Sequence, residues 1–307
     1  MQTILGAGGA IGADLAKELP KYTDKIRLVS RNPIKVNETD ELFRADLSDP
    51  STVDKAIEGS EVVYLVVGFD YNINVWRKTW PALVRSVIDA CKKHKAKLVF
   101  FDNVYMYDRD YISHMTENTT IRPTSKKGDV RAQIAKMIMD EVYKRELTAL
   151  IARSADFCGA KNNILVEVVY KNYIKGKKAN WIADANKKHS LTFTEDAARG
   201  TAMLGNTPDS FNQVWHLPTI KPPLTGKEWI ELMAAEMKVK PGISVLPVWM
   251  MSVLGVFMPI MKELGEMAYQ YNRDYYFDSS KFEQRFNYVP VSAPEAIRLT
   301  VQRLTKA

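Results

Sequence analysis

Gln2-Thr-Ile-Leu-Gly6-Ala-Gly8-Gly9-Ala-Ile-Gly12 is the stretch that decides the fold. A short apolar run is followed by a glycine-rich loop, and a helical pattern begins after the loop. Glycines at these positions permit a tight turn and a close approach of the backbone to a pyrophosphate at the start of the helix. The third glycine stands one position later than in the pattern G-x-G-x-x-G, but the strand, loop and helix follow in the order that the motif requires. The sequence therefore predicts a dinucleotide site that contains Gly6, Gly8, Gly9, Ala10, Ile11 and Gly12.

The alternation of strands and helices continues through the first half of the chain. Runs rich in valine, isoleucine and leucine predict buried strands at 2–5, 26–30, 61–67, 97–102 and 148–152. Apolar residues at helical spacing predict helices near 12–19, 51–57, 76–94 and 129–143. This alternation indicates an α/β Rossmann fold with a doubly wound parallel sheet. We expect a Rossmann core over 1–160, with further core segments near 190–220. A smaller C-terminal substrate lobe over 161–307 is expected to interleave with it.

The composition is that of an ordinary globular protein. The chain has 307 residues, of which 46% are hydrophobic and 26% charged, and this excludes wholesale disorder, a collagen-like structure and a coiled coil. Its net charge of +7 is too diffuse to indicate a nucleic-acid partner. Two cysteines are too few for a disulfide scaffold or a cysteine-rich zinc module, and the four histidines lack metal-ligand spacing. No metal site is expected.

The N-terminus and the most apolar stretch of the sequence indicate where in the cell the protein is expected to be. Met1 leads directly into the first predicted strand without the regions of a signal peptide, so a cytoplasmic protein is expected. The stretch 246–261 is shorter than the roughly 20 residues of a spanning helix, and Pro247, Gly255 and Pro259 interrupt it. It is interpreted as buried core or as a pocket wall, and no membrane partner is expected.

The end of the second predicted strand carries Ser30 and Arg31. An NAD site usually has an acidic residue there, which accepts a hydrogen bond from the ribose 2′-hydroxyl. A hydroxyl and a guanidinium suit a 2′-phosphate instead, so the expected cofactor is NADP. Asp46 and Leu47 follow in the next loop, where an acidic side chain can meet the adenine amino group.

Several segments, in a fixed order, resemble the extended and atypical short-chain dehydrogenase/reductase superfamily, the NAD-dependent epimerase/dehydratase family. The glycine loop is similar to its N-terminal motif, and residues 101–108 (Phe-Asp-Asn-Val-Tyr-Met-Tyr-Asp) resemble its segment F-S-S-x-x-V-Y-G. Residues 153–159, 192–198, 215–218 and 278–282 resemble later segments of the family, so the resemblance covers nearly the whole chain. It implies that Val66, Val67 and Gly68 line the cofactor ribose, and that Asp156 and Phe157 run past the nicotinamide.

The catalytic positions depart from the family pattern. The family typically uses Ser or Thr together with Tyr and Lys, the last two written Y-x-x-x-K. An ungapped alignment of residues 115–131 with I-T-E-D-T-P-L-R-P-T-S-P-Y-x-x-x-K puts Lys127 at the tyrosine position and Arg131 at the lysine position. Asn103 stands at the Ser/Thr position. The resemblance thus implies a catalytic set of Lys127, Asn103 and Arg131, in which Lys127 also contacts the cofactor.

Two side chains are candidates for the proton donor. Lys127 can release its proton, whereas arginine keeps its own near neutral pH. Tyr105, just beyond the fifth predicted strand, is the alternative donor. Charges in a pocket can bring the pKa of a phenol from about 10 towards the working pH, where it can donate its proton.

Three functions stay open. The first is an NADP(H)-dependent oxidoreductase or epimerase-like enzyme with a non-standard proton donor, acting on a small carbonyl, imine or sugar-type substrate. The second is a catalytically silent NADP-binding redox sensor or regulator. The third is an enzyme of another class that borrows the cofactor, for example for internal redox and isomerisation. The expected partner is a small-molecule substrate, and a homodimer is left open. Oxidation of bound NADPH by a panel of carbonyls and imines separates the first two functions.

Overall fold

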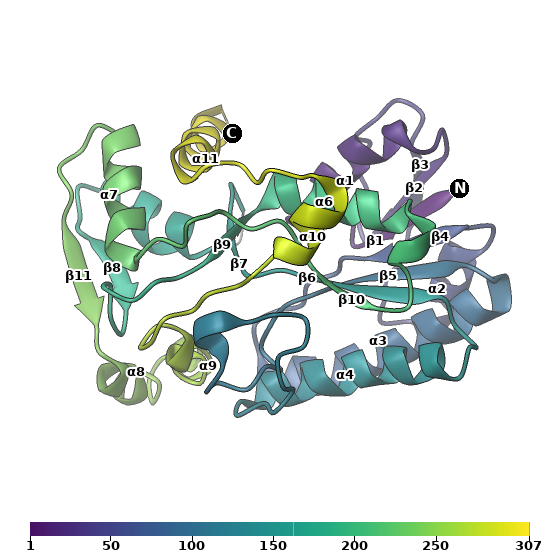
Figure 1. Ribbon diagram of the computed structural model, residues 1–307, viewed down its shortest axis with the longest axis horizontal. Helices are drawn as coiled ribbons and strands as arrows, with labels where there is room; N and C mark the ends of the chain where they lie inside the picture. Colours follow the sequence, from purple (N-terminus) through teal and green to yellow (C-terminus); the bar gives the residue numbers. More distant parts are fainter. Residues whose placement is uncertain (162, 307) are drawn as a thin grey trace. The chain divides into compact units, whose positions relative to one another are not determined.

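A seven-stranded parallel sheet is the central element of the computed structural model, which describes residues 1–161 and 163–306 (Figure 1). Its strands lie in the order β10-β6-β5-β4-β1-β2-β3, and each neighbouring pair is parallel. The strands are β1 Gln2–Leu5, β2 Ile26–Ser30, β3 Glu41–Arg44, β4 Val62–Leu65, β5 Lys97–Asp102, β6 Ala149–Arg153 and β10 Val214–His216. The strand order reverses between β1 and β4, so the predicted doubly wound Rossmann fold is confirmed.

Helices cover both faces of this sheet. α2 (Pro50–Ile57), α3 (Ile73–His94) and α4 (Lys126–Tyr143) lie on one face, and α1 (Gly12–Glu18) and α6 (Thr194–Gly205) lie on the other (Figure 1). Apolar side chains such as Leu83, Val84, Ile134 and Ile138 pack α3 and α4 against the strands. Burial of apolar surface contributes roughly 25 cal/mol per Å², so this packing fixes where the two helices begin above the sheet edge.

The starts of α3 and α4 position candidate site residues. The Asn72 side chain caps α3 by accepting hydrogen bonds from the backbone N–H groups of Asn74 and Val75, at 2.8 and 3.4 Å. α4 begins at Lys126, about three residues earlier than the sequence suggests. Lys127 therefore lies inside the first turn of the helix rather than before the helix.

The chain folds into two compact units. The first contains Met1–Met106, Lys127–Arg153 and Ala197–Leu217, and the second contains Tyr107–Lys126, Ser154–Asp196 and Pro218–Ala307. The first unit holds the seven-stranded sheet. The expected domain boundary near residue 160 stays a prediction.

The second unit is built on two small parallel sheets. β7 (Asp156–Cys158) pairs with β9 (Leu191–Phe193), and β8 (Ala179–Ile182) pairs with β11 (Ile243–Leu246). Trp181 and Trp229 are fully buried in its core. Its helices are α5 Lys171–Tyr173, α7 Gly226–Glu236, α8 Val248–Leu254, α9 Pro259–Gly265, α10 Ser280–Phe286 and α11 Ala293–Lys306. α7 opens with a capping box formed by Thr225 and Glu228.

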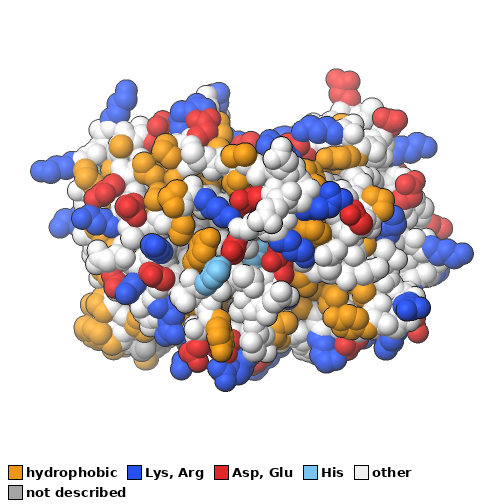
Figure 2. Space-filling view, viewed as in Figure 1, with side chains coloured by type: hydrophobic (Ala, Val, Ile, Leu, Met, Phe, Trp, Pro, Cys, Tyr) orange, Lys and Arg blue, Asp and Glu red, His pale blue; other side chains and the backbone are white. Residues whose placement is uncertain are grey.

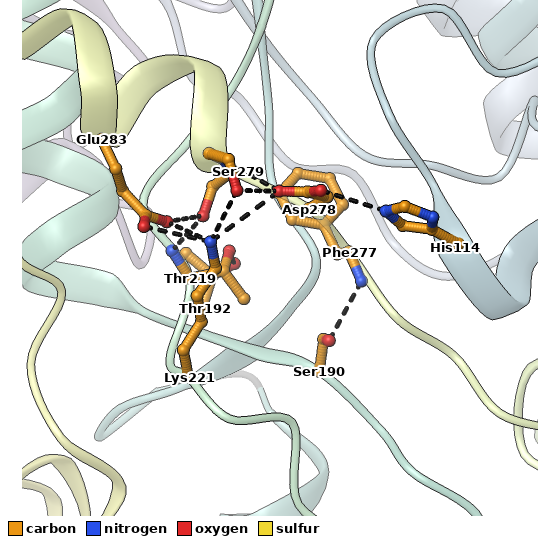
Figure 3. A network of polar contacts seen from close by, with 10 residues as sticks. His114, Ser190, Thr192, Thr219, Lys221, Phe277, Asp278, Ser279 and Glu283 are labelled. Carbon is orange, nitrogen blue, oxygen red and sulfur yellow. Dashed lines mark hydrogen bonds and ion pairs between the residues drawn. The ribbon is translucent and has the colours of Figure 1, made fainter.

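A polar network joins separate segments of the second unit around Asp278 and Ser279 (Figure 3). Asp278 Oδ2 lies 3.0 Å from His114 Nε2, and Ser279 Oγ accepts a hydrogen bond from Thr219 N at 3.1 Å. Ser279 also donates to Glu283 Oε1 at 2.6 Å. This turn belongs to the segment at 278–282 that resembles a family motif, and its contacts here are with the protein itself.

The apolar stretch 246–261 differs from its expected burial. It forms α8, the turn after it and the start of α9, and Trp249 and Phe257 are 66% and 82% exposed. Its interpretation as buried core is wrong for these side chains, because each of the two helices has only seven residues and α9 buries none of its own. Within the described residues, we find no helix with the length and hydrophobicity needed to cross a bilayer.

Candidate functional site

The glycine loop leaves the carboxyl end of β1 beside the end of β4. Gly6 has a φ of +99°, and a Cβ at this position would lie 2.7 Å from the Val67 Cα. At Gly12 a Cβ would lie 2.6 Å from the Ala7 Cα, so α1 packs on the loop only with glycine there. At Gly8 a Cβ would meet no atom within 4 Å. The loop is closely packed on its inner side and open at Gly8, which suits a backbone cradle for phosphate.

A cavity of 540 Å³ lies over this loop in the first unit. Its size falls in the range of small-molecule sites, and it lies at the carboxyl ends of parallel strands, where such sheets bind ligands. Many of the expected cofactor residues line it: Gly6, Gly8, Gly9, Ser30, Arg31, Asp46, Leu47, Val67 and Gly68. Other expected residues in this part of the chain lie outside its lining: Ala10, Ile11, Gly12, Val66 and Lys127.

The end of β2 carries an unsatisfied hydroxyl. Ser30 Oγ is buried and has no hydrogen-bond partner within the described chain, although it lies at the cavity wall. The register of β2 with β3 pairs Ser30 with Arg44, and Arg44 and Arg31 line an adjoining pocket. Neither arginine forms an ion pair within the part of the chain that the structure describes. A hydroxyl flanked by two guanidinium groups suits an anion with several acceptor oxygens.

Arg44 is a site residue that the sequence analysis missed. It stands 13 positions after Arg31, in a strand whose existence the sequence did not indicate. The register with Ser30 is the only signal that brings it here, and register is not visible in the local pattern.

Asp46 faces the same cavity from the loop after β3. Its Oδ1 accepts hydrogen bonds from Ser48 N at 3.0 Å and from Ser48 Oγ at 2.8 Å. These bonds, together with the Arg31 charge, lower the pKa of Asp46 below its usual value. The carboxylate is therefore ionised at neutral pH and can accept a hydrogen bond from an amino group.

Lys127 is fully buried in the first turn of α4. Its Nζ lies 4.6 Å from the centroid of the Tyr71 ring, which is a cation–π contact. Tyr71 comes from the loop between β4 and α3, and its ring meets Trp76 edge-on at 5.8 Å. The sequence analysis missed Tyr71, because only the packing of α4 on α3 brings it to Lys127.

Arg131 lies one turn further along α4 and points into the protein. Its Nε donates to Asp102 Oδ1 at 2.7 Å, and its guanidinium carbon lies 4.4 Å from the Trp80 ring centroid and 5.1 Å from that of Phe100. Arg153 Nε approaches the other Asp102 oxygen at 3.4 Å. This environment gives Arg131 a structural role, so its expected catalytic role stays a prediction that the contacts disfavour.

Asn103 and Tyr105 follow β5 directly. Asn103 Oδ1 accepts a hydrogen bond from Tyr105 N at 3.1 Å, and the Tyr105 ring stacks on Trp76 at 6.2 Å. Trp76 also contacts Tyr71, which lies under Lys127. Lys127 and Tyr105 thus contact one group of stacked or edge-on rings, Tyr71 and Trp76, and Asn103 is hydrogen-bonded to the Tyr105 backbone. The structure brings these three expected catalytic residues together beyond the ends of β4 and β5.

Asp156 and Phe157 belong to the second unit, in β7. Asp156 Oδ2 lies 2.9 Å from His189 Nε2 and accepts a hydrogen bond from the Tyr271 hydroxyl, also at 2.9 Å. The His189 ring is stacked between Tyr271 and Tyr275 at 4.4 and 4.5 Å, and its Nδ1 is buried without a partner in the described chain. The sequence analysis missed His189 and Tyr271, which stand 33 and 115 residues from Asp156.

Two kinds of chemistry find no support at these sites. Within residues 1–161 and 163–306, no group of three metal-ligating side chains is found. Burial raises the pKa of the Cys158 thiol to about 12, so it is protonated at neutral pH and a poor nucleophile.

The comparisons with known proteins agree with this fold. Residues 6–127 match the family model described as NAD(P)H-binding, so this part of the chain is an NAD(P)-binding domain. The chain also shares its fold with solved epimerase and dehydratase structures, which agrees with the expected resemblance to the extended short-chain dehydrogenase/reductase superfamily.

Particular relatives are distant in sequence. The chain is 23% identical over 285 residues to 3beta-hydroxysteroid-dehydrogenase/decarboxylase isoform 2 of Arabidopsis thaliana, a match that covers 84% of this chain and 50% of that protein. The chain thus spans about half the length of this curated relative.

Among solved structures, the fold is similar to the Bacillus cereus UDP-glucuronic acid 4-epimerase in complex with UDP-glucuronic acid and NAD. The TM-score is 0.81 at 15% identity, over 100% of this chain and 99% of that one. The Thermus thermophilus UDP-glucose 4-epimerase complex with NAD gives a TM-score of 0.79 at 16% identity, over 100% of both chains.

Proposed function

We propose that the chain is an NADP(H)-dependent oxidoreductase or epimerase-like enzyme in which Lys127 replaces the usual tyrosine as proton donor. The observation that carries the cofactor half of this proposal is the buried, unsatisfied Ser30 Oγ beside Arg31 and Arg44. A 2′-phosphate supplies both the charge and the acceptors that these three side chains lack.

The remaining cavity residues fit the rest of a dinucleotide. The open backbone at Gly8 would hold the pyrophosphate, and the Asp46 carboxylate would accept from the adenine amino group. When bound, the cofactor supplies a hydride donor or acceptor. The protein's own task is then to bind a substrate oxygen or nitrogen, to orient it and to exchange a proton with it.

Lys127 is the group in the first unit best suited to that proton exchange. Its ammonium carries a transferable proton, and its full burial, against the Tyr71 ring, excludes bulk water. Asn103, at the end of β5, carries amide N–H groups that can orient a carbonyl or imine. Arg131 holds α4 through Asp102 and cannot exchange its proton near neutral pH.

A silent NADP-binding regulator is the second candidate, and one observation favours it. The position that binds ribose hydroxyls in the family carries Arg131, whose donors are directed to Asp102 rather than to the cavity. A protein that binds the cofactor without turnover needs no side chain there.

The deciding experiment measures NADPH binding and NADPH oxidation on the same preparations. Wild type, Lys127→Met and Tyr105→Phe are titrated with NADPH and then assayed with a panel of aldehydes, ketones, imines and nucleotide-sugar ketones. We expect turnover by wild type, unchanged cofactor affinity in both variants and loss of kcat in Lys127→Met alone. Loss in Tyr105→Phe alone would assign the proton to Tyr105. Tight NADPH binding with no turnover across the panel would favour the silent regulator.

A further inference from the structure

The start of α4, the helix that carries Lys127, is bound by a side chain from a distant part of the chain. Glu266 Oε1 accepts a hydrogen bond from the backbone N–H of Lys126, the first residue of α4, although the two residues stand 140 positions apart. The N–H groups of a first helical turn have no partner within their own helix, and they carry its partial positive charge. A carboxylate at this place therefore caps the helix and is itself stabilised as an anion.

A second contact joins the same two segments. The Tyr269 hydroxyl is hydrogen-bonded to the side chain of Ser125, the residue directly before α4. Burial raises the pKa of Tyr269 to about 12, so this phenol keeps its proton near neutral pH. Of these two side chains, only Glu266 brings a charge to the start of α4.

The segment that carries both side chains, residues 266–271 (the α4 strap), is fixed in the second unit. Met267, Ala268 and Gln270 are buried, and the 3-10 turn η5 (Ala268–Gln270) shapes the middle of the strap. At its end, the Tyr271 hydroxyl donates to Asp156 Oδ2 at 2.9 Å. Because the strap is anchored in this way, the half-buried Glu266 side chain is held at the helix start.

The part of the sequence around the strap offers few carboxylates. Positions 237–273 contain only two acidic residues, Glu263 and Glu266. The helices before the strap, α8 and α9, expose hydrophobic side chains instead, and these gather at the lower left of Figure 2, where α8 lies in Figure 1. Glu263, at the end of α9, is half-buried and is the one alternative source of negative charge in this stretch.

Lys127 is the next residue of α4, and helical side chains lean towards the N-terminus of their helix. Its side chain therefore leans towards the end that Glu266 caps. The other charged or titratable groups that flank Lys127 come from α4, β5 and the loop before α3: the exposed Lys126 and Asp129, the ion pair of Arg131 with Asp102, and Tyr71. Water screens the exposed charges and Arg131 compensates Asp102, so Glu266 is the carboxylate best placed to act on Lys127.

We propose that Glu266 is a positioning residue for Lys127: its carboxylate fixes the first turn of α4 and keeps the Lys127 ammonium in its charged, proton-donating form. A nearby opposite charge favours the charged form of an ammonium. The inference rests on the proposed function, in which Lys127 donates the proton. Glu266 itself exchanges no proton with the substrate.

Glu266→Gln separates the charge from the hydrogen bond, because the glutamine amide oxygen can still accept from the Lys126 N–H. We expect its kcat for NADPH-dependent carbonyl reduction to decline at a pH about one unit lower than in wild type, with unchanged affinity for NADPH. Amide hydrogen exchange at the start of α4 should match wild type in Glu266→Gln and be faster in Glu266→Ala, which removes the acceptor. Glu236→Gln is the matched control, because Glu236 is an exposed acidic residue at the end of α7 in the same unit.

A measurement that needs no turnover separates this inference from the proposed function. The ¹⁵N resonance of Lys127 Nζ, assigned by its loss in Lys127→Met, reports the loss of the ammonium proton as the pH is raised. We expect this transition to move about one pH unit lower in Glu266→Gln and to stay in place in Glu236→Gln.

Two results would overturn the proposal. The first is a Glu266→Gln variant with the wild-type pH profile and the wild-type Lys127 resonance at every pH, which would leave Glu266 as a helix cap alone. The second is a shift in Glu263→Gln and none in Glu266→Gln, which would assign the effect to Glu263. A wild type without turnover whose Lys127 resonance still shifts in Glu266→Gln would refute the proposed function and uphold the action of Glu266 on Lys127.

Discussion

Arg131 Nε donates a hydrogen bond to Asp102 Oδ1 at 2.7 Å, and both side chains are almost completely buried. Asp102 is the last residue of β5, and Arg131 lies in the second turn of α4. The ion pair therefore fixes α4 to the sheet directly beside Lys127. The family's Y-x-x-x-K string has a lysine at this position, which carries a single ammonium group. The guanidinium of Arg131 instead contacts both the Asp102 carboxylate and the rings of Trp76, Trp80 and Phe100.

The first prediction concerns the stability of this pair. Asp102→Ala would leave the buried guanidinium of Arg131 without its acceptor, and breaking a buried pair costs about 3–5 kcal/mol. We expect the free energy of unfolding, measured by chemical denaturation, to fall by about that amount. Asp140→Ala is the control, because it removes an exposed pair with Lys136 on the same helix and should cost at most about 1 kcal/mol. Equal stability of the two variants would contradict a structural role for the pair.

The second prediction concerns cofactor choice. A charge-assisted hydrogen bond contributes roughly 1.5–3 kcal/mol, so Arg31→Ala and Arg44→Ala should each weaken NADPH binding by about ten- to a hundredfold. NADH binding should hardly change, because it lacks the 2′-phosphate. Calorimetric titration of both cofactors measures the ratio, and Arg85→Ala, an exposed arginine on α3, is the control. Equal affinity of wild type for NADH and NADPH would refute the assignment.

The third prediction separates two glycines of the same loop. Gly8→Ala should leave the melting temperature unchanged but weaken binding of NADPH and NADH alike, since its Cβ enters only the open cradle. Gly12→Ala should lower the melting temperature, because its Cβ would lie 2.6 Å from the Ala7 Cα. Thermal unfolding and cofactor titration of both variants are the measurements. Full cofactor affinity in a well-folded Gly8→Ala variant would show that the pyrophosphate binds elsewhere.

The sequence predicts the interior of the sheet better than its edges. The bounds expected for β1, β2 and β5 agree with the structure, because these strands are continuous apolar runs buried on both faces. β3 was missed, and β10 was indicated only by the resemblance of residues 215–218 to a late strand of the family. Both are edge strands of three or four residues, and the β3 sequence Glu-Leu-Phe-Arg is mostly exposed, so hydrophobicity gives no signal for it.

The residues of the candidate site also fall into two groups, those that a local sequence pattern indicates and those that it does not. The glycine loop is a local pattern and is visible in the sequence, as is the Ser30-Arg31 pair that follows a buried strand. Arg44, Tyr71 and His189 come to their positions only through register or through packing of distant segments. Such contacts depend on the whole fold, so no local motif could have indicated them.

The fourth prediction concerns acid stability. Burial alone would raise the pKa of Asp278, but hydrogen bonds from Ser280 and His114 outweigh it and lower this pKa from 3.8 to about 2. Because the folded state holds the carboxylate ionised, the stabilisation is complete above about pH 4 and is lost as the pH falls towards 2. The carboxylate is partly exposed, so the effect should be about 1 kcal/mol. Asp278→Asn should flatten the pH dependence of the unfolding free energy in this window, and the exposed Asp24→Asn should not. An unchanged pH profile in Asp278→Asn would contradict the pKa shift.

The last prediction concerns Lys127 and separates function from stability. A buried ammonium that faces an aromatic ring has a desolvation cost that a methionine of similar length does not, so a lysine retained only for packing would be a poor choice. If Lys127 serves proton transfer, Lys127→Met should be at least as stable as wild type in denaturant while its kcat for NADPH oxidation falls by about 10²–10⁴-fold. Tyr71→Leu should change stability and kcat in the opposite way, because it removes the ring that faces the ammonium but keeps the Lys127 proton. We expect that variant to be less stable and to retain turnover. A Lys127→Met protein that unfolds more easily than wild type but turns over at the wild-type rate would assign Lys127 to the packing of α4 and return the proton to Tyr105.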